Sequence, residues 1–107
     1  MPNSEITLDE LFGRIDHLGD DEVVLDVRRP DEYEDGHIPG SINISHTDVA
    51  DKITELKKYK KIYIHCKAGG RARQATAVLE ANGFNNLVCI SDAGMDAWRN
   101  RGYPIEN

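Results

Sequence analysis

One stretch of the chain constrains its fold more than any other: an apolar run that ends at a cysteine and leads into a helical pattern. The run covers residues 62–64, the cysteine is Cys66, and the helical pattern extends from about residue 72 to residue 82. A short loop with two adjacent glycines joins them. This order of elements is typical of a parallel sheet, in which ligands bind where the strands end. The stretch therefore predicts both a fold class and the position of a site.

Similar apolar runs recur along the chain at residues 23–27 and 87–90, and residues 41–44 indicate another short strand. A continuous apolar run indicates a strand that is buried on both faces of a sheet. Helical patterns alternate with these runs. Thr7 and Glu10 match the capping box of a first helix, and residues 48–59 have the spacing of an amphipathic helix.

Further helical signals complete the pattern. Pro30 opens a short helix, and Met95 and Trp98 belong to a last helix, in which we interpret them as core residues. Alternating strands and helices predict an α/β fold with a mostly parallel central sheet of about five strands and helices on both faces.

Length and charge limit the possible functions. A chain of 107 residues is expected to form one domain over residues 1–107, with its core at about residues 6–104. The formal net charge of −6 argues against general binding to nucleic acid or to anionic membranes. Neither a leader sequence nor an apolar run long enough to cross a bilayer is visible, so we expect a cytoplasmic protein with two free thiols.

The loop after Cys66 has the chemistry of an anion site. Small residues allow successive backbone N–H groups to point inward, and the start of a helix favours negative charge. Lys67 and Arg71 add positive charge to an otherwise acidic chain. A thiol in such surroundings is readily held as a thiolate, which is a strong nucleophile without a general base.

Three segments resemble the signatures of rhodanese domains. Residues 25–44 are similar to the N-terminal signature, residues 64–71 to the catalytic loop, and residues 94–98 to the C-terminal signature. The three follow one another at the spacing of the family, so the resemblance covers nearly the whole chain.

The resemblance implies a sulfurtransferase of the thiosulfate sulfurtransferase type. By this resemblance Cys66 accepts sulfane sulfur from thiosulfate or a persulfide donor, forms a cysteine persulfide and passes the sulfur to a thiol, to cyanide or to a protein acceptor. No metal or organic cofactor is implied. The residues expected to bind the anionic sulfur or the substrate are Lys67, Ala68, Gly69, Gly70 and Arg71.

Two other functions compete with this one. The first is a non-catalytic, sulfur-carrier or regulatory rhodanese module. The second is arsenate reduction or phosphatase action. Phosphatases with a cysteine nucleophile on similar folds place an arginine six positions after it, whereas Ala72 stands there in this chain. The arginines lie at positions 71 and 73, so the loop length favours sulfur. Arg71 either contacts the substrate or holds the loop by pairing with a carboxylate.

Other reactive side chains have simpler interpretations. Cys89 lies in an apolar run and is expected to be a core residue. His65 should point to the opposite face of the sheet from Cys66, and His37 should hydrogen-bond the backbone of its turn. We expect an internal ion pair among three charged residues at and just after the end of the run at residues 23–27: Asp26, Arg28 and Glu32.

Overall fold

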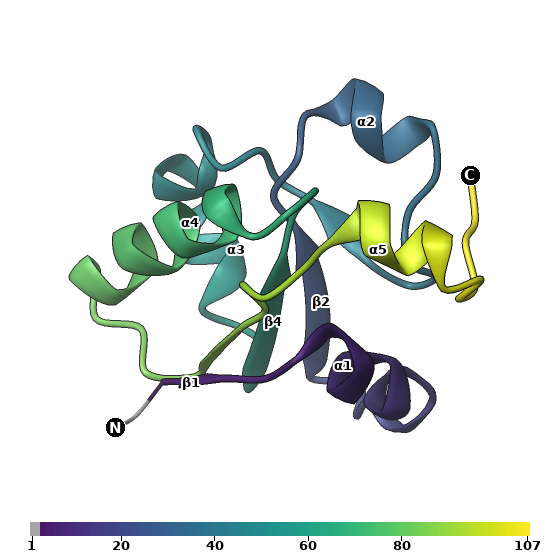
Figure 1. Cartoon of the computed structure of the whole chain (residues 1–107). Helices are drawn as coiled ribbons and strands as arrows, with labels where there is room; N and C mark the ends of the chain where they lie inside the picture. Colours follow the sequence, from purple (N-terminus) through teal and green to yellow (C-terminus); the bar gives the residue numbers. More distant parts are fainter. Residues whose placement is uncertain (1–2) are drawn as a thin grey trace.

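The computed structural model describes residues 3–107 and is organised around one sheet (Figure 1). The sheet has five strands in the order β1-β5-β4-β2-β3, and every pairing is parallel. This arrangement confirms the predicted fold class. The strands are β1 (Ser4–Glu5), β2 (Glu22–Asp26), β3 (Ile42–Asn43), β4 (Lys61–His65) and β5 (Leu87–Cys89).

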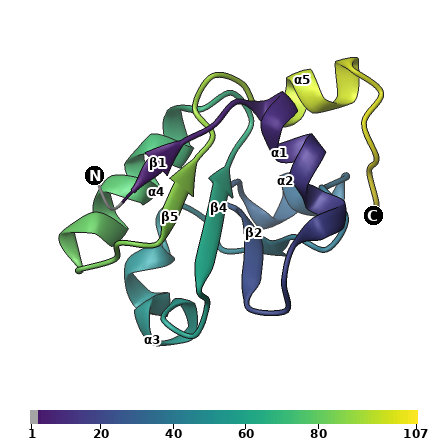
Figure 2. The same ribbon diagram turned by 90° about the horizontal axis from the view of Figure 1, so that it is seen from below.

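Helices cover both faces of this sheet (Figure 2). The helices α4 and α3 pack with one hydrophobic cluster, and α1 and α5 pack with a second cluster on the opposite face. The short α2 follows β2. The bounds are α1 (Leu8–Arg14), α2 (Pro30–Glu34), α3 (Ile53–Leu56), α4 (Gly70–Ala81) and α5 (Met95–Asn100), with 3₁₀ turns η1 (Ile15–His17) and η2 (Val49–Lys52).

The residues of β4 alternate between the two clusters. Ile62 and Ile64 belong to the cluster under α4, whereas Tyr63 belongs to the cluster under α1 and α5. Because side chains alternate along a strand, His65 lies on the α1 and α5 side, and Cys66 lies under α4. The expectation that these two neighbours face opposite sides is confirmed.

The predicted start of α1 is also confirmed. The Thr7 hydroxyl accepts a hydrogen bond from the Glu10 N–H, and the Glu10 carboxylate accepts one from the Thr7 N–H, both at 3.1 Å. This capping box satisfies two N–H groups that the first helical turn leaves without intrahelical partners.

The structure corrects the prediction of one helix over residues 48–59. The segment contains η2 and the single turn α3, after which Lys60 donates its N–H to the carbonyl of Asp21 at 2.7 Å. That bond aligns the starts of β2 and β4, so sheet pairing ends the helix earlier than its apolar spacing suggests. Val49 and Leu56 are nevertheless buried, as the spacing predicted.

Two further boundaries differ. Helix α4 begins at Gly70 rather than near residue 72, because the glycine loop itself forms the first helical turn. Strand β1 has no apolar run of its own: its two exposed residues pair with Val88 and Cys89 at the sheet edge. Only the sheet gives these two residues their conformation.

Candidate active site

The loop after β4 curls around the sulfur of Cys66. The Sγ atom accepts hydrogen bonds from the N–H of Gly69 at 3.0 Å and from the N–H of Ala72 at 3.3 Å. The side chain is only 1% exposed, so the sulfur lies at the bottom of the loop. Two backbone donors on one sulfur stabilise negative charge there without a basic side chain.

The start of α4 explains both donors. Gly69 caps the helix at a φ of 117°, a left-handed conformation that glycine adopts without strain, and a Cβ there would collide with the carbonyl of Ser91. Ala72 lies in the first turn, where N–H groups have no intrahelical partner. The sequence-based set ended at Arg71 and missed Ala72. The sequence signal that could have identified Ala72 is that it is the first apolar, helix-forming residue directly after the loop.

Helix α5 holds the other side of the loop. Met95 donates its N–H to the carbonyl of Cys66 at 2.9 Å, and Asp96 donates its N–H to the carbonyl of Lys67 at 3.3 Å. A Cβ on Gly94 would collide with both carbonyls. These two hydrogen bonds hold both carbonyl oxygens against the start of α5, where the N–H groups offset their partial negative charge. The role of Gly94 was also missed, although residues 94–98 had been noted as a signature.

Arg71 pairs with a carboxylate from α2. Its two guanidinium nitrogens lie 2.6 and 3.1 Å from the two carboxylate oxygens of Glu32. Glu32 also accepts the N–H of Arg29 at 3.0 Å, which caps α2. The hydrogen bonds from Arg71 lower the pKa of Glu32 from 4.5 to about 2. The structure therefore connects the loop to α2 through this ion pair, the second of the two roles considered for Arg71.

The other residues of the loop differ in exposure. Lys67, Ala68 and Gly70 are exposed, whereas Gly69 is buried beneath them. Among the ion pairs within residues 3–107, none involves Lys67. Lys67 is thus the unpaired cation nearest in sequence to the thiol.

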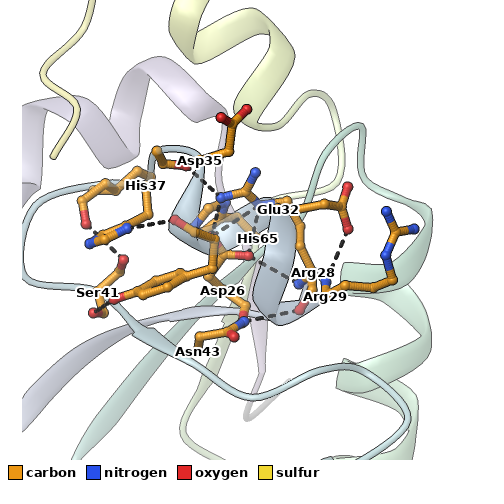
Figure 3. A network of polar contacts seen from close by, with 12 residues as sticks. Asp26, Arg28, Arg29, Glu32, Asp35, His37, Ser41, Asn43 and His65 are labelled. Atoms are coloured by element: carbon orange, nitrogen blue, oxygen red, sulfur yellow. Dashed lines mark hydrogen bonds and ion pairs between the residues drawn. The ribbon is translucent and has the colours of Figure 1, made fainter. Parts of the chain in front are cut away.

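A second polar network lies behind the loop, at the ends of β2 and β4 (Figure 3). Arg28 binds Asp26 through its guanidinium at 2.7 Å and donates to the carbonyl of Gly36 at 2.9 Å. Both side chains are almost fully buried. The predicted internal ion pair is confirmed for these two residues, but Glu32 instead faces Arg71.

His65 lies beside this network and is fully buried. Its Nε2 lies 3.8 Å from a carboxylate oxygen of Asp26, and within residues 3–107 neither ring nitrogen has a hydrogen-bond partner. Burial lowers the pKa of His65. The predicted role of His37 is confirmed as well, because its Nδ1 lies 2.8 Å from the carbonyl oxygen of Tyr33.

The second cysteine is a core residue, as predicted. Cys89 is 3% exposed, and both cysteines are free thiols. Burial raises the pKa of Cys89 above its usual 9.0. Met95 and Trp98 are buried against α1, also as predicted.

Two further findings concern metal ions and membranes. In the part of the chain that the structure describes, no three histidine, cysteine or carboxylate side chains are grouped to hold a metal ion. No helix within residues 3–107 is both long enough and apolar enough to span a membrane.

Comparison with known proteins agrees with this geometry. Residues 8–101 match the family described as the rhodanese-like domain. The match covers most of the chain, including the loop at Cys66 and the start of α5. The chain belongs to the rhodanese-like domain family, as the three sequence signatures suggested.

Individual relatives support a sulfurtransferase role. The chain is 34% identical to the thiosulfate sulfurtransferase GlpE of Pseudomonas syringae over 84 residues, which are 78% of this chain and 77% of that protein. It is also 34% identical, over 98% of its length, to an HTH-type transcriptional regulator of Mycobacterium tuberculosis, but spans only 46% of that longer protein. A crystal structure of a rhodanese-related protein from Thermoplasma volcanium superposes with a TM-score of 0.82 at 32% identity, covering 96% of this chain and 97% of that one.

Proposed function

We propose that this protein transfers sulfane sulfur through a persulfide on Cys66. One observation carries the proposal: the sulfur receives the N–H groups of Gly69 and Ala72 at the head of α4. Such donors stabilise a thiolate before the reaction and an anionic persulfide after it. The similarity to GlpE supports the same assignment.

The reaction has two half-steps. In the first, the Cys66 thiolate attacks the outer sulfur of thiosulfate, a new S–S bond forms, and sulfite leaves with the electron pair of the broken bond. In the second, a thiolate or cyanide attacks the terminal sulfur of the persulfide, and the Cys66 thiolate leaves with the electron pair. The acceptor becomes a persulfide or thiocyanate. Both half-steps are exchanges at sulfur and need no external oxidant.

The direct test is the intact mass of the protein after incubation with thiosulfate. We expect a gain of one sulfur atom in the wild type and in Cys89→Ser, and none in Cys66→Ser. Cyanide should remove the added sulfur. Failure of the wild type to gain sulfur from any sulfane donor would contradict the proposal.

A sulfur-carrier or regulatory module is the second candidate, favoured by the similarity to part of a longer transcriptional regulator. Such a module would load Cys66 once but turn over slowly with small acceptors. Comparing one round of loading with steady-state thiocyanate formation separates the two functions. A fast first round followed by negligible turnover would favour the carrier.

A further inference from the structure

The two cations of the loop have different surroundings. The guanidinium of Arg71 is occupied on two nitrogens by Glu32, and the two side chains are only 23% and 16% exposed. The ammonium of Lys67 belongs to an exposed residue that takes part in no ion pair within residues 3–107. Of these two loop cations, therefore, Arg71 is neutralised locally, whereas Lys67 has no ion-pair partner within residues 3–107. Arg73, two positions beyond Arg71, is likewise exposed and in none of these ion pairs, and it donates to the carbonyl of Ser91 at 3.4 Å.

Holding Arg71 in this pair is favourable in itself. A carboxylate that accepts two guanidinium N–H groups with fork geometry forms one of the stronger polar contacts in proteins. To turn the same two N–H groups to a substrate, Arg71 would have to leave the carboxylate of Glu32 without its ion-pair partner, and that negative charge would also repel an incoming anion. Both effects keep Arg71 away from a negatively charged donor.

We propose that Glu32 is a specificity-determining residue: it binds Arg71 and so lowers the positive charge available beside Cys66, which favours singly charged donors over doubly charged ones. The inference rests on the proposed function. The favoured class is alkyl persulfides, whose sulfur end carries at most one negative charge. Thiosulfate, a dianion, is the disfavoured donor.

Sulfur transfer from an alkyl persulfide differs from transfer from thiosulfate only in the leaving group. The Cys66 thiolate attacks the outer sulfur of R–S–SH, and Cys66–S–SH forms. The S–S bond of the donor breaks, and RS⁻ leaves with its electron pair. Sulfur is transferred without net oxidation of the protein and donor together, and no sulfite charge has to be accommodated.

The substitution Glu32→Gln tests the inference. Glutamine keeps an oxygen that can accept the Arg29 N–H, so α2 remains capped, but it removes the charge that holds Arg71. We expect the ratio of kcat/KM for thiosulfate to kcat/KM for 2-hydroxyethyl persulfide to rise about fivefold, mainly through a lower KM for thiosulfate. An unchanged ratio would overturn the inference.

Two variants separate this effect from net charge and from folding. Glu34→Gln makes the same charge change at an exposed residue of α2 and should leave the ratio within about twofold of the wild type. A rise in Glu34→Gln equal to that in Glu32→Gln would overturn the inference. The double variant with Glu32→Gln and Arg71→Gln removes the whole pair at constant net charge, so its ratio should return to the wild-type value.

The double variant also stands alone if Glu32→Gln does not fold. A marked increase in its KM for thiosulfate would mean that Arg71 contacts the donor directly, and the inference would fail. These results are distinguishable from failure of the proposed function. If the wild type accepts sulfur from neither donor, the function is wrong; if it accepts sulfur from both and Glu32→Gln leaves the ratio unchanged, only the role of Glu32 is wrong.

Discussion

The two cysteines share one hydrophobic cluster under α4, yet they differ in the backbone hydrogen bonds that their sulfur atoms accept. Cys66 and Cys89 are 1% and 3% exposed, so accessibility does not distinguish them. A cavity of about 370 Å³ opens beside Cys89, lined also by Arg73 and Thr76. Judged by its cavity, Cys89 would be the candidate nucleophile.

Their positions along α4 explain the difference. Cys66 meets the first turn, where Ala72 still has a free N–H to donate. Cys89 lies near Thr76, one turn later, where the helix uses its own N–H groups and the threonine hydroxyl donates to the carbonyl of Ala72. Burial without backbone donors raises the pKa of Cys89. One helical turn therefore separates a sulfur that accepts two backbone N–H groups from a thiol whose pKa is raised by burial.

The largest expected effect comes from breaking the support of the Cys66 loop. In Gly94→Ala, the new Cβ would push the carbonyls of Cys66 and Lys67 off the start of α5. We expect sulfur loading of Cys66 to slow about 100-fold, since a shift of about 1 Å in a reacting group has effects of this size. The loading rate is measured by quenched-flow mass analysis.

Gly13→Ala provides the matched control, because a Cβ at Gly13 meets no atom within 4 Å. It should load at the wild-type rate and be slightly more stable, by about 0.5–1 kcal/mol, as expected for alanine within a helix. Equal loading rates in the two variants would show that Gly94 is not required for the loop.

The next effect concerns the reactivity of the two thiols in one molecule. In the folded protein at pH 7.5, iodoacetamide should modify Cys66 at least roughly ten times faster than Cys89, because only Cys66 receives backbone N–H donors. Peptide mapping after timed quenching measures both rates. In guanidinium chloride the rates should converge, and faster labelling of Cys89 in the native state would reverse the comparison.

The smallest effect concerns stability against pH. The Cys66 loop is fastened to α2 by the ion pair between Arg71 and Glu32, in which the pKa of Glu32 falls from 4.5 to about 2. A lowered pKa stabilises the folded state above about pH 4.5, and this contribution disappears as pH falls toward 2. Glu32→Gln should therefore reduce the free energy of unfolding by about 1 kcal/mol at pH 7 and by progressively less below pH 4.5.

Urea unfolding at several pH values measures this difference. Cys89→Ala is the control, because it changes packing alone and its effect should stay constant between pH 7 and pH 3. If the effect of Glu32→Gln is also constant over this range, the ion pair does not contribute to stability as its geometry suggests.

Local patterns were sufficient for much of the fold. The apolar run before Cys66 and the capping box at Thr7 each depend on residues within a few positions, so spacing alone predicts them. Residues 48–59 were predicted less well, since the pairing of Lys60 with Asp21 ends the helix early. The edge strand β1 had no local signal at all.

The candidate site also combines features that local sequence predicts with features that it does not. Sequence alone determined where the thiol lies, which residues form its loop, and that a helix follows, because strand end, glycines and helix start are consecutive in the chain. Only the tertiary structure decided the partner of Arg71 and the need for glycine at position 94. Glu32 is 39 residues from Arg71, and Gly94 is 28 residues from Cys66. Contacts at such separations depend on how parallel strands bring their ends together, and spacing in the sequence does not specify that.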